Sequence, residues 1–389
     1  MRMLSHVDPD EIVDLLQAMV RTRSVNPPAK TEECAGILLD LFRAEGIDAE
    51  SVEGAPGVVN VVATLRGTQP GPKLILNGHI DTVPAGEDWT VDPFGGELRD
   101  GQIWGRGTCD MKSGVAAMLM AIVELKRSGE SFAGEVQFQA VADEETGSRW
   151  GTLHLIERGY CDGADFAICT EPTNLAVELG NRGLRWIDVT VEGLASHAGR
   201  PQLGVNAVEI ASDIIGNIQA IEFDLHDDRF EIPSPSISVT TIAGGHTVNV
   251  IPDRCTFSVD RRMLPGETGE QVLAELEGAV SPVRERYEGA KIEVSVRPGS
   301  WDPYTISPDE PVAVAAVEAA REVLGHDPVV GYKAACTDAS HLVTRAGIPT
   351  VLFGPGNQQL SHKPDERIAV EALVNGTAVY VEMMRSLLG

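Results

Sequence analysis

The chain has 389 residues, of which 43% are hydrophobic and 23% charged, and a formal net charge of −27 from 31 basic and 58 acidic residues. This length can fill two ordinary domains, and the acidity argues against nucleic acid as a partner, because Lys and Arg contacts drive binding to the phosphate backbone. No apolar run approaches the roughly 20 residues of a membrane span, and residues 1–10 lack the pattern of a signal peptide, so we expect a cytoplasmic protein with no membrane contact.

The amino-terminal part alternates helical and strand patterns. Apolar residues recur at helical spacing over residues 9–19 and 31–45, and strands are predicted over 58–65 and 73–77. The second strand leads directly to His79 and Asp81. Open α/β sheets keep their active sites at the carboxyl ends of strands. This stretch therefore predicts a site, whose other members should follow other strands.

Further carboxylates follow later elements. A long loop over residues 85–107 leads to Asp110, which precedes a helix predicted over 115–126. A strand over 134–141 leads to Glu144 and Glu145, and another over 165–170 leads to Glu171. These carboxylates are the expected partners of His79.

The pattern of elements changes after Arg182. Strands are predicted over residues 184–192, 237–243, 254–261 and 291–297, with helices over 205–221 and 269–287. The order β-α-β-β-α-β is typical of a split β-α-β sandwich. We predict an inserted domain of residues 182–297, which the chain leaves at Arg297-Pro298-Gly299. Residues 1–181 and 298–389 should then form one α/β domain.

The carboxyl-terminal part returns to alternating elements. Helices are predicted over 311–324, over 338–346 and from about residue 366, with strands over 329–332 and 349–353. His362 lies between the last strand and the last helix. A second polar histidine thus follows a strand.

The residues collected at strand ends suit a metal site. Two imidazoles and several carboxylates, without a thiolate, form a donor set for zinc, cobalt or manganese. If two ions lie side by side, one carboxylate must bridge them, and a water between them becomes a nucleophile at neutral pH. Consecutive residues of an extended segment point in opposite directions, so one of Glu144 and Glu145 can bind metal while the other acts as a general base. Asp81 is placed to accept the second ring N–H of His79.

Five segments of the chain, in order, resemble the signature segments of the M20 family of metallopeptidases. Within that family the sequence is most similar to the acetylornithine deacetylase / succinyl-diaminopimelate desuccinylase branch. The likeness covers nearly the whole chain. The segments are His79-Ile80-Asp81-Thr82-Val83-Pro84, Gly105-Arg106-Gly107 through Asp110-Met111-Lys112, Asp143-Glu144-Glu145-Thr146-Gly147, Thr170-Glu171-Pro172 and Ser361-His362-Lys363-Pro364-Asp365-Glu366.

The resemblance implies an α/β fold with a three-layer α/β/α zinc-peptidase-like catalytic domain, formed by residues 1–181 and 298–389. The insert of residues 182–297 would be a ferredoxin-like (βαββαβ) dimerisation domain, so we expect a homodimer. Two divalent metal ions are implied, Zn²⁺ in the first place and Co²⁺ or Mn²⁺ as alternatives. Their ligands would be His79 and Glu171 on one ion, Glu145 and His362 on the other, and Asp110 bridging both.

The resemblance also implies roles for other residues. Glu144 would be the general base, Asp81 would support His79, and the Asp110–Met111 peptide bond would be cis. His197 would reach the active site of the partner subunit and stabilise the oxyanion. Asn249 would contact substrate, and Arg182 with Arg261 or Arg262 would bind a substrate carboxylate, which a planar guanidinium can hold through two hydrogen bonds.

The predicted activity is cleavage of the amide bond of an N-acyl amino acid, as in a deacetylase or desuccinylase, through a metal-bridged hydroxide with Glu144 as the base. A carboxypeptidase or dipeptidase of the same family, acting on short peptides, would keep every metal ligand and stays an alternative. A metal-dependent binding protein without catalysis is another. Without the other segments, Glu144 and Glu145 would be read as a solvated turn, and the arginines as surface ion pairs.

Overall fold

The computed structural model describes residues 4–389, which form two compact units. The first unit contains the chain up to Asn181 together with Thr305–Lys333 and Thr337–Gly389. The second contains Arg182–Tyr304 and Ala334–Cys336, and is therefore inserted into the first. No helix within residues 4–389 is both long enough and apolar enough to cross a bilayer.

A mixed sheet runs through the first unit. Over the described residues its order is β1-β2-β6-β3-β7-β17-β8-β15, with β16 paired to β8. The strand β3 lies near the middle, parallel to β6 on one side and to β7 on the other. The carboxyl ends of these three strands therefore meet at one edge. The strands are β1 (Asp48–Ala55), β2 (Val58–Arg66), β3 (Gln69–His79), β6 (Ala133–Val141), β7 (Phe166–Cys169), β8 (Val177–Asn181), β15 (Tyr304–Thr305), β16 (Val330–Lys333) and β17 (Thr350–Leu352).

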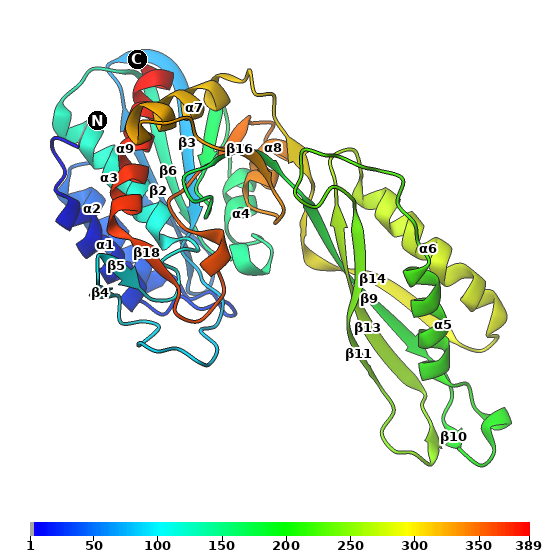
Figure 1. Ribbon diagram of the computed structural model, residues 1–389. Helices are drawn as coiled ribbons and strands as arrows, with labels where there is room; N and C mark the ends of the chain where they lie inside the picture. Colours follow the sequence, from blue (N-terminus) through cyan, green and yellow to red (C-terminus); the bar gives the residue numbers. More distant parts are fainter. Residues whose placement is uncertain (1–3) are drawn as a thin grey trace. The chain divides into compact units, whose positions relative to one another are not determined.

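Helices cover both faces of this sheet (Figure 1). Side chains alternate along β3, so Leu74 and Leu76 join the large core under one group of helices, while Ile75 packs with Leu342 of α8 on the opposite face. The predicted three-layer α/β/α architecture is confirmed. The first group is α1 (Pro9–Arg21), α2 (Glu32–Ala44), α3 (Lys112–Ser128), α7 (Pro311–Leu324) and α9 (Val370–Leu388), and the second is α4 (Thr152–Glu157) and α8 (Ala339–Thr344).

The second unit has the predicted ferredoxin-like fold. Its antiparallel sheet has the order β11-β13-β9-β14, and two helices pack on one face (Figure 1). Alternate residues of β9, Ile187, Val189 and Val191, face these helices and are buried with them. In chain order the elements are β9 (Gly183–Glu192), α5 (Ala207–Gln219), β11 (Ser236–Gly244), β13 (Arg254–Met263), α6 (Gly269–Arg286) and β14 (Lys291–Trp301).

Some element boundaries differ from the prediction, two of them through unpredicted strand structure. Pro298 and Gly299 lie inside β14, in a register shift between Val296 and Ser300, so this turn-like pair marks a bulge and the chain stays in the sheet. The last helix begins at Val370, because the residues before it form β18 (Arg367–Ala369). This short strand pairs with β5 (Gln102–Trp104), which pairs with β4 (Glu97–Arg99), so the long predicted loop contains a small sheet.

Candidate active site

Asp110 lies between two histidines that come from opposite ends of the chain. Its Oδ1 is 3.2 Å from Nε2 of His79, and its Oδ2 is 3.3 Å from Nε2 of His362. The same nitrogen of His362 is 3.2 Å from Oε1 of Glu145. One ligand atom each of His79, Asp110 and Glu145 lie within 4.8 Å of one another. A single carboxylate thus offers a separate oxygen to each histidine, which is what a bridging ligand must do.

The backbone positions His79 for this contact. His79 is the last residue of β3, and its Nδ1 is 2.9 Å from the carbonyl oxygen of Asp81. A carbonyl can only accept, so Nδ1 carries the proton and leaves the lone pair of Nε2 for a metal. The prediction gave this acceptor role to the Asp81 carboxylate, which lies farther away, at 3.6 Å. The main chain of Asp81 orients the ring instead.

The Asp81 carboxylate holds the turn that carries the two glutamates. It accepts the main-chain N–H groups of Glu144 and Glu145, each at 3.2 Å, and an N–H of Asn26 at 2.8 Å. Sequence reasoning did not identify Asn26, which precedes two prolines and carries no motif of its own. Asp81 therefore acts on the site mainly through the backbone of the 144–145 turn.

Backbone strain marks this turn and also the segment that carries His362. Asp143 has φ of +68° and His362 has φ of +63°, a left-handed conformation that is uncommon outside glycine and costs energy unless the surroundings hold it. Asp338 accepts hydrogen bonds from the hydroxyls of Ser148 and Thr152, which follow the turn in the chain. Its side chain makes no capping hydrogen bond at the start of α8. The turn is thus held from two sides.

Glu171 lies two residues after the end of β7 and is buried. The charges of Asp110 and His79 both act on its carboxyl group. The ammonium of Lys333 is 3.9 Å from its carboxylate and 3.8 Å from that of Glu178, and donates to the carbonyl of Pro172 at 3.1 Å. Sequence reasoning missed Lys333, a buried cation that balances part of the negative charge.

The electrostatics show an excess of carboxylates. Burial raises the pKa of Glu171 to about 8 and that of Asp81 to about 6, and it holds the pKa of Glu144 well above its ordinary value. Hydrogen bonds to Asp110 and Glu145 raise the pKa of His362 to about 10. Burial thus favours the protonated forms of Glu144, Glu171 and Asp81, and the carboxylates beside His362 favour its protonated ring.

The residues present fit divalent ions. They offer imidazole nitrogens and carboxylate oxygens at one strand edge, which are the donors of zinc, cobalt and manganese sites, and a cation would replace the protons that the site now attracts. His79, Asp110, Glu145 and His362 are brought together by direct contacts, and Glu171 by its neighbouring charge. The Asp110–Met111 peptide bond is cis, as expected.

Within the second unit, the structure brings His197 and Asn249 together. His197 ends β10 (Ser196–His197), which pairs with β12 (Val250–Ile251), and the N–H of Ala198 donates to the carbonyl of Asn249 at 3.0 Å. The ring of His197 is exposed, and its Nδ1 accepts the N–H of Gly199 at 2.9 Å. The proton of the neutral ring therefore lies on Nε2, which is free to act as a donor.

The arginines differ from the prediction. The side chain of Arg261 is 0% exposed and is engaged by Glu267, by Glu275 at 3.0 Å and by the ring of Phe223. A substrate carboxylate cannot reach it, so the prediction for Arg261 is wrong, because a buried ion pair consumes its donors. Arg182 is also buried and donates to the carbonyl of Ser234 at 2.9 Å. Arg262, which pairs with Asp260, stays 31% exposed.

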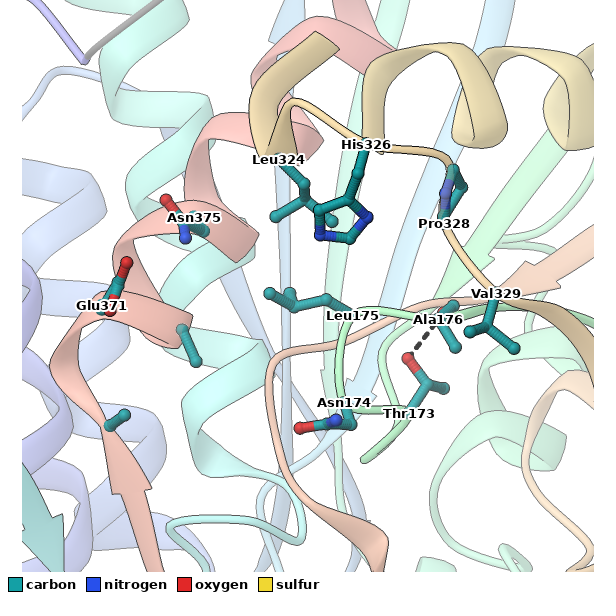
Figure 2. Close-up of a pocket in the computed structure, with 12 residues that line it drawn as sticks. Thr173, Asn174, Leu175, Ala176, Leu324, His326, Pro328, Val329, Glu371 and Asn375 are labelled. Carbon is teal, nitrogen blue, oxygen red and sulfur yellow. Dashed lines mark hydrogen bonds between the residues drawn. The ribbon is translucent and has the colours of Figure 1, made fainter. Parts of the chain in front are cut away.

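A cavity of 680 Å³ lies elsewhere in the first unit, near the start of α9. Figure 2 shows the side chains of Leu175 and His326 turned toward this space, and the hydroxyl of Thr173 donating to the carbonyl of Ala176. None of the predicted ligands is among its described lining residues. We assign it no role in the chemistry.

Residues 75–386 match the sequence profile of Peptidase family M20/M25/M40. The chain belongs to the M20 family. Its fold and the order of its site segments are those of an M20 hydrolase, a family of metallopeptidases and amidohydrolases.

Other M20 proteins are similar over almost their whole length. The succinyl-diaminopimelate desuccinylase of Wolinella succinogenes is 32% identical over 93% of this chain and 96% of its own. The N-formyl-4-amino-5-aminomethyl-2-methylpyrimidine deformylase of Bacillus subtilis is 28% identical over 97% of this chain and 94% of its own. An M20 family metallo-carboxypeptidase from Sulfolobus solfataricus has the same fold, with a TM-score of 0.81, 20% identity and coverage of 97% and 99% of the two chains.

Proposed function

We propose that this M20 hydrolase is a dinuclear metal amidohydrolase that removes the acyl group of an N-acyl amino acid. The observation that carries the proposal is the position of Asp110, with one carboxylate oxygen toward His79 and the other toward His362. We assign His79 and Glu171 to one ion, Glu145 and His362 to the other, and Asp110 to both. Zn²⁺ is the proposed metal, with Co²⁺ and Mn²⁺ as alternatives.

Two such ions would lower the pKa of a water between them and polarise the scissile carbonyl. Glu144 is the proposed base: its Oε2 is 4.0 Å from Nε2 of His79, and burial raises the pKa of its carboxyl. It takes a proton from the attacking water and later gives it to the leaving nitrogen. Addition of water across the amide then yields a carboxylate and an amine.

The names of the relatives support an acyl group as the part removed. One relative is a desuccinylase and another a deformylase, so proteins about equally similar to this chain differ in the acyl group that they release. This supports a small-molecule amide substrate and leaves the acyl group to experiment. Asn249 and Arg182 are the proposed substrate contacts, with Arg262 in place of Arg261.

We also propose that the chain forms a homodimer through its second unit and that His197 serves the active site of the partner. The Nε2–H tautomer set by Gly199 suits a donor to an oxyanion. Large apolar side chains in this unit face solvent, among them Val248 at 100% exposure, Leu203 at 59% and Leu194 at 57%. A second copy of the chain that covered these side chains would remove them from water.

The experiment is a screen of protein reconstituted with Zn²⁺ or Co²⁺ against N-acetyl, N-formyl and N-succinyl amino acids, with dipeptides in parallel. Release of free amine from the acyl compounds, lost after chelation and restored by either ion, is the expected result. Cleavage restricted to dipeptides would instead assign a peptidase. No hydrolysis by the metal-loaded dimer across the panel would contradict the proposal.

A further inference from the structure

Glu366 is a fully buried carboxylate that no proposed catalytic step uses. Its Oε1 accepts three main-chain N–H groups, from Gly107 at 3.1 Å, Cys109 at 2.7 Å and Asp110 at 3.0 Å. Its Oε2 accepts from the guanidinium of Arg106 at 2.5 Å. Four donors thus converge on one side chain, and one of them is the amide of the proposed bridging ligand.

The same contacts join the two segments that carry ligands of both ions. Glu366 lies four residues after His362, and its own carbonyl accepts the N–H of Gly105 at 2.9 Å. Arg106 donates to the carbonyl of Lys363 at 3.3 Å, one residue from His362. The loop that ends in Asp110 is therefore attached to the loop that presents His362, through groups that are themselves buried.

Arg106 and Glu366 form a buried ion pair. Arg106 is 2% exposed, so it and Glu366 are withdrawn from water together. The guanidinium and the three N–H groups are the donors that replace water around the buried carboxylate. A buried ion pair of this kind contributes little net stability compared with apolar packing, but it fixes geometry. Because Glu366 accepts the main-chain N–H of Asp110, the geometry that it fixes is that of the Asp110 backbone.

We propose that Glu366, held by Arg106, is a positioning residue that sets the main chain of Asp110 relative to His362, so that one carboxylate can serve both metal ions. This inference rests on the proposed dinuclear site. Groups that hydrogen-bond to metal ligands and orient them typically change metal affinity by about 10- to 100-fold when they are altered. Because Asp110 faces both histidines, loss of the Glu366 side chain weakens the binding of both ions.

The test uses the full-length, metal-free protein and Co²⁺ as the probe. Glu366→Ala removes all four contacts, and Glu366→Gln keeps the shape but places an amide N–H₂ against the guanidinium of Arg106. Glu124→Gln is the matched control, because it removes another buried carboxylate that accepts main-chain N–H groups. Glu124 lies in the second half of α3 and accepts the N–H groups of Ser5 and His6, none of which is a proposed ligand. Calorimetry gives affinity and stoichiometry, and the visible spectrum of bound Co²⁺ reports its coordination.

For wild type and Glu124→Gln, we expect two Co²⁺ ions with the same spectrum. Both Glu366 variants should bind Co²⁺ about 10- to 100-fold more weakly and with an altered spectrum, the Gln variant less severely. Folded Glu366→Gln protein that binds two Co²⁺ ions with unchanged affinity and spectrum would overturn the inference. An equal loss of Co²⁺ affinity in Glu124→Gln would also overturn it, because it would indicate general destabilisation. If wild type itself bound no Co²⁺, the proposed function would fail instead.

Discussion

Glu144 and Glu145 are consecutive residues, yet their carboxylates lie beside different histidines. Oε2 of Glu144 is 4.0 Å from Nε2 of His79, whereas Oε1 of Glu145 is 3.2 Å from Nε2 of His362. The main-chain N–H groups of both residues donate to the Asp81 carboxylate, which holds the backbone while the side chains diverge. One carboxylate can therefore bind metal while its neighbour moves protons.

Replacing each glutamate separately should produce different defects. Glu144→Gln should lower kcat by about 10²- to 10⁴-fold, the usual loss for a general base, while both ions stay bound. Glu145→Gln, which differs by one position, should lose metal. Metal content by elemental analysis and turnover of an N-acyl substrate separate the two effects. Near-normal turnover in Glu144→Gln would remove the base assignment.

The metal-free protein should become less stable as the pH rises from below 6 to above 8. The pKa of Asp81 is raised to about 6 and that of Glu171 to about 8, so the folded state holds protons that the unfolded chain has already released, and stability is lost as each group deprotonates. The raised pKa of His362, about 10, acts in the same direction. Thermal unfolding with a chelator should show Tm falling across this range.

With Zn²⁺ or Co²⁺ bound, that dependence should weaken, because the ions replace the protons. The comparison at each pH uses the same protein with and without metal. A Tm of the metal-free form that is flat or rises between these pH values would show that the site does not carry uncompensated carboxylates.

Mixing two inactive variants should restore activity if His197 works across a dimer. His197→Ala and Glu144→Ala chains would each be inactive as homodimers, whereas one active site of a heterodimer would contain both an intact Glu144 and an intact His197. Co-refolded or exchanged mixtures should recover up to about a quarter of wild-type turnover at equal amounts, because half of random dimers are heterodimers with one complete site. Heterodimers that stay inactive would show that His197 does not act in the active site of the partner chain.

Arg261→Met should destabilise the second unit and leave substrate affinity unchanged. The guanidinium is fully buried between Glu267 and Glu275, and removing it leaves their charges without a partner. We expect a loss of about 3 kcal/mol, the low end for breaking a buried pair, because Glu275 is one-third exposed. Urea unfolding gives the loss, and KM gives the comparison with Arg262→Met, which should raise KM.

The proposed metal ligands could be picked out from the sequence because their signal is local in the chain. His79, Asp110, Glu145 and Glu171 each sit at the end of a strand or the start of a helix, and strand and helix periodicity locates such ends. The groups that support them carry no such signal. Asn26 and Lys333 reach the site from distant parts of the chain, whereas Arg106 and Glu366 fell within segments that the family resemblance had marked.

The sequence by itself determined the chemistry of this protein: the donor types, their order, the family and the two-unit organisation all follow from motifs and periodicity along one chain. Only the tertiary structure decided how those residues are used. In the folded chain the ring of His79 contacts the carbonyl of Asp81, and the Asp81 carboxylate accepts main-chain N–H groups of the 144–145 turn. Arg261 is buried and paired with glutamates. These hydrogen bonds and ion pairs form only when packing brings the groups together, so local sequence patterns do not reveal them.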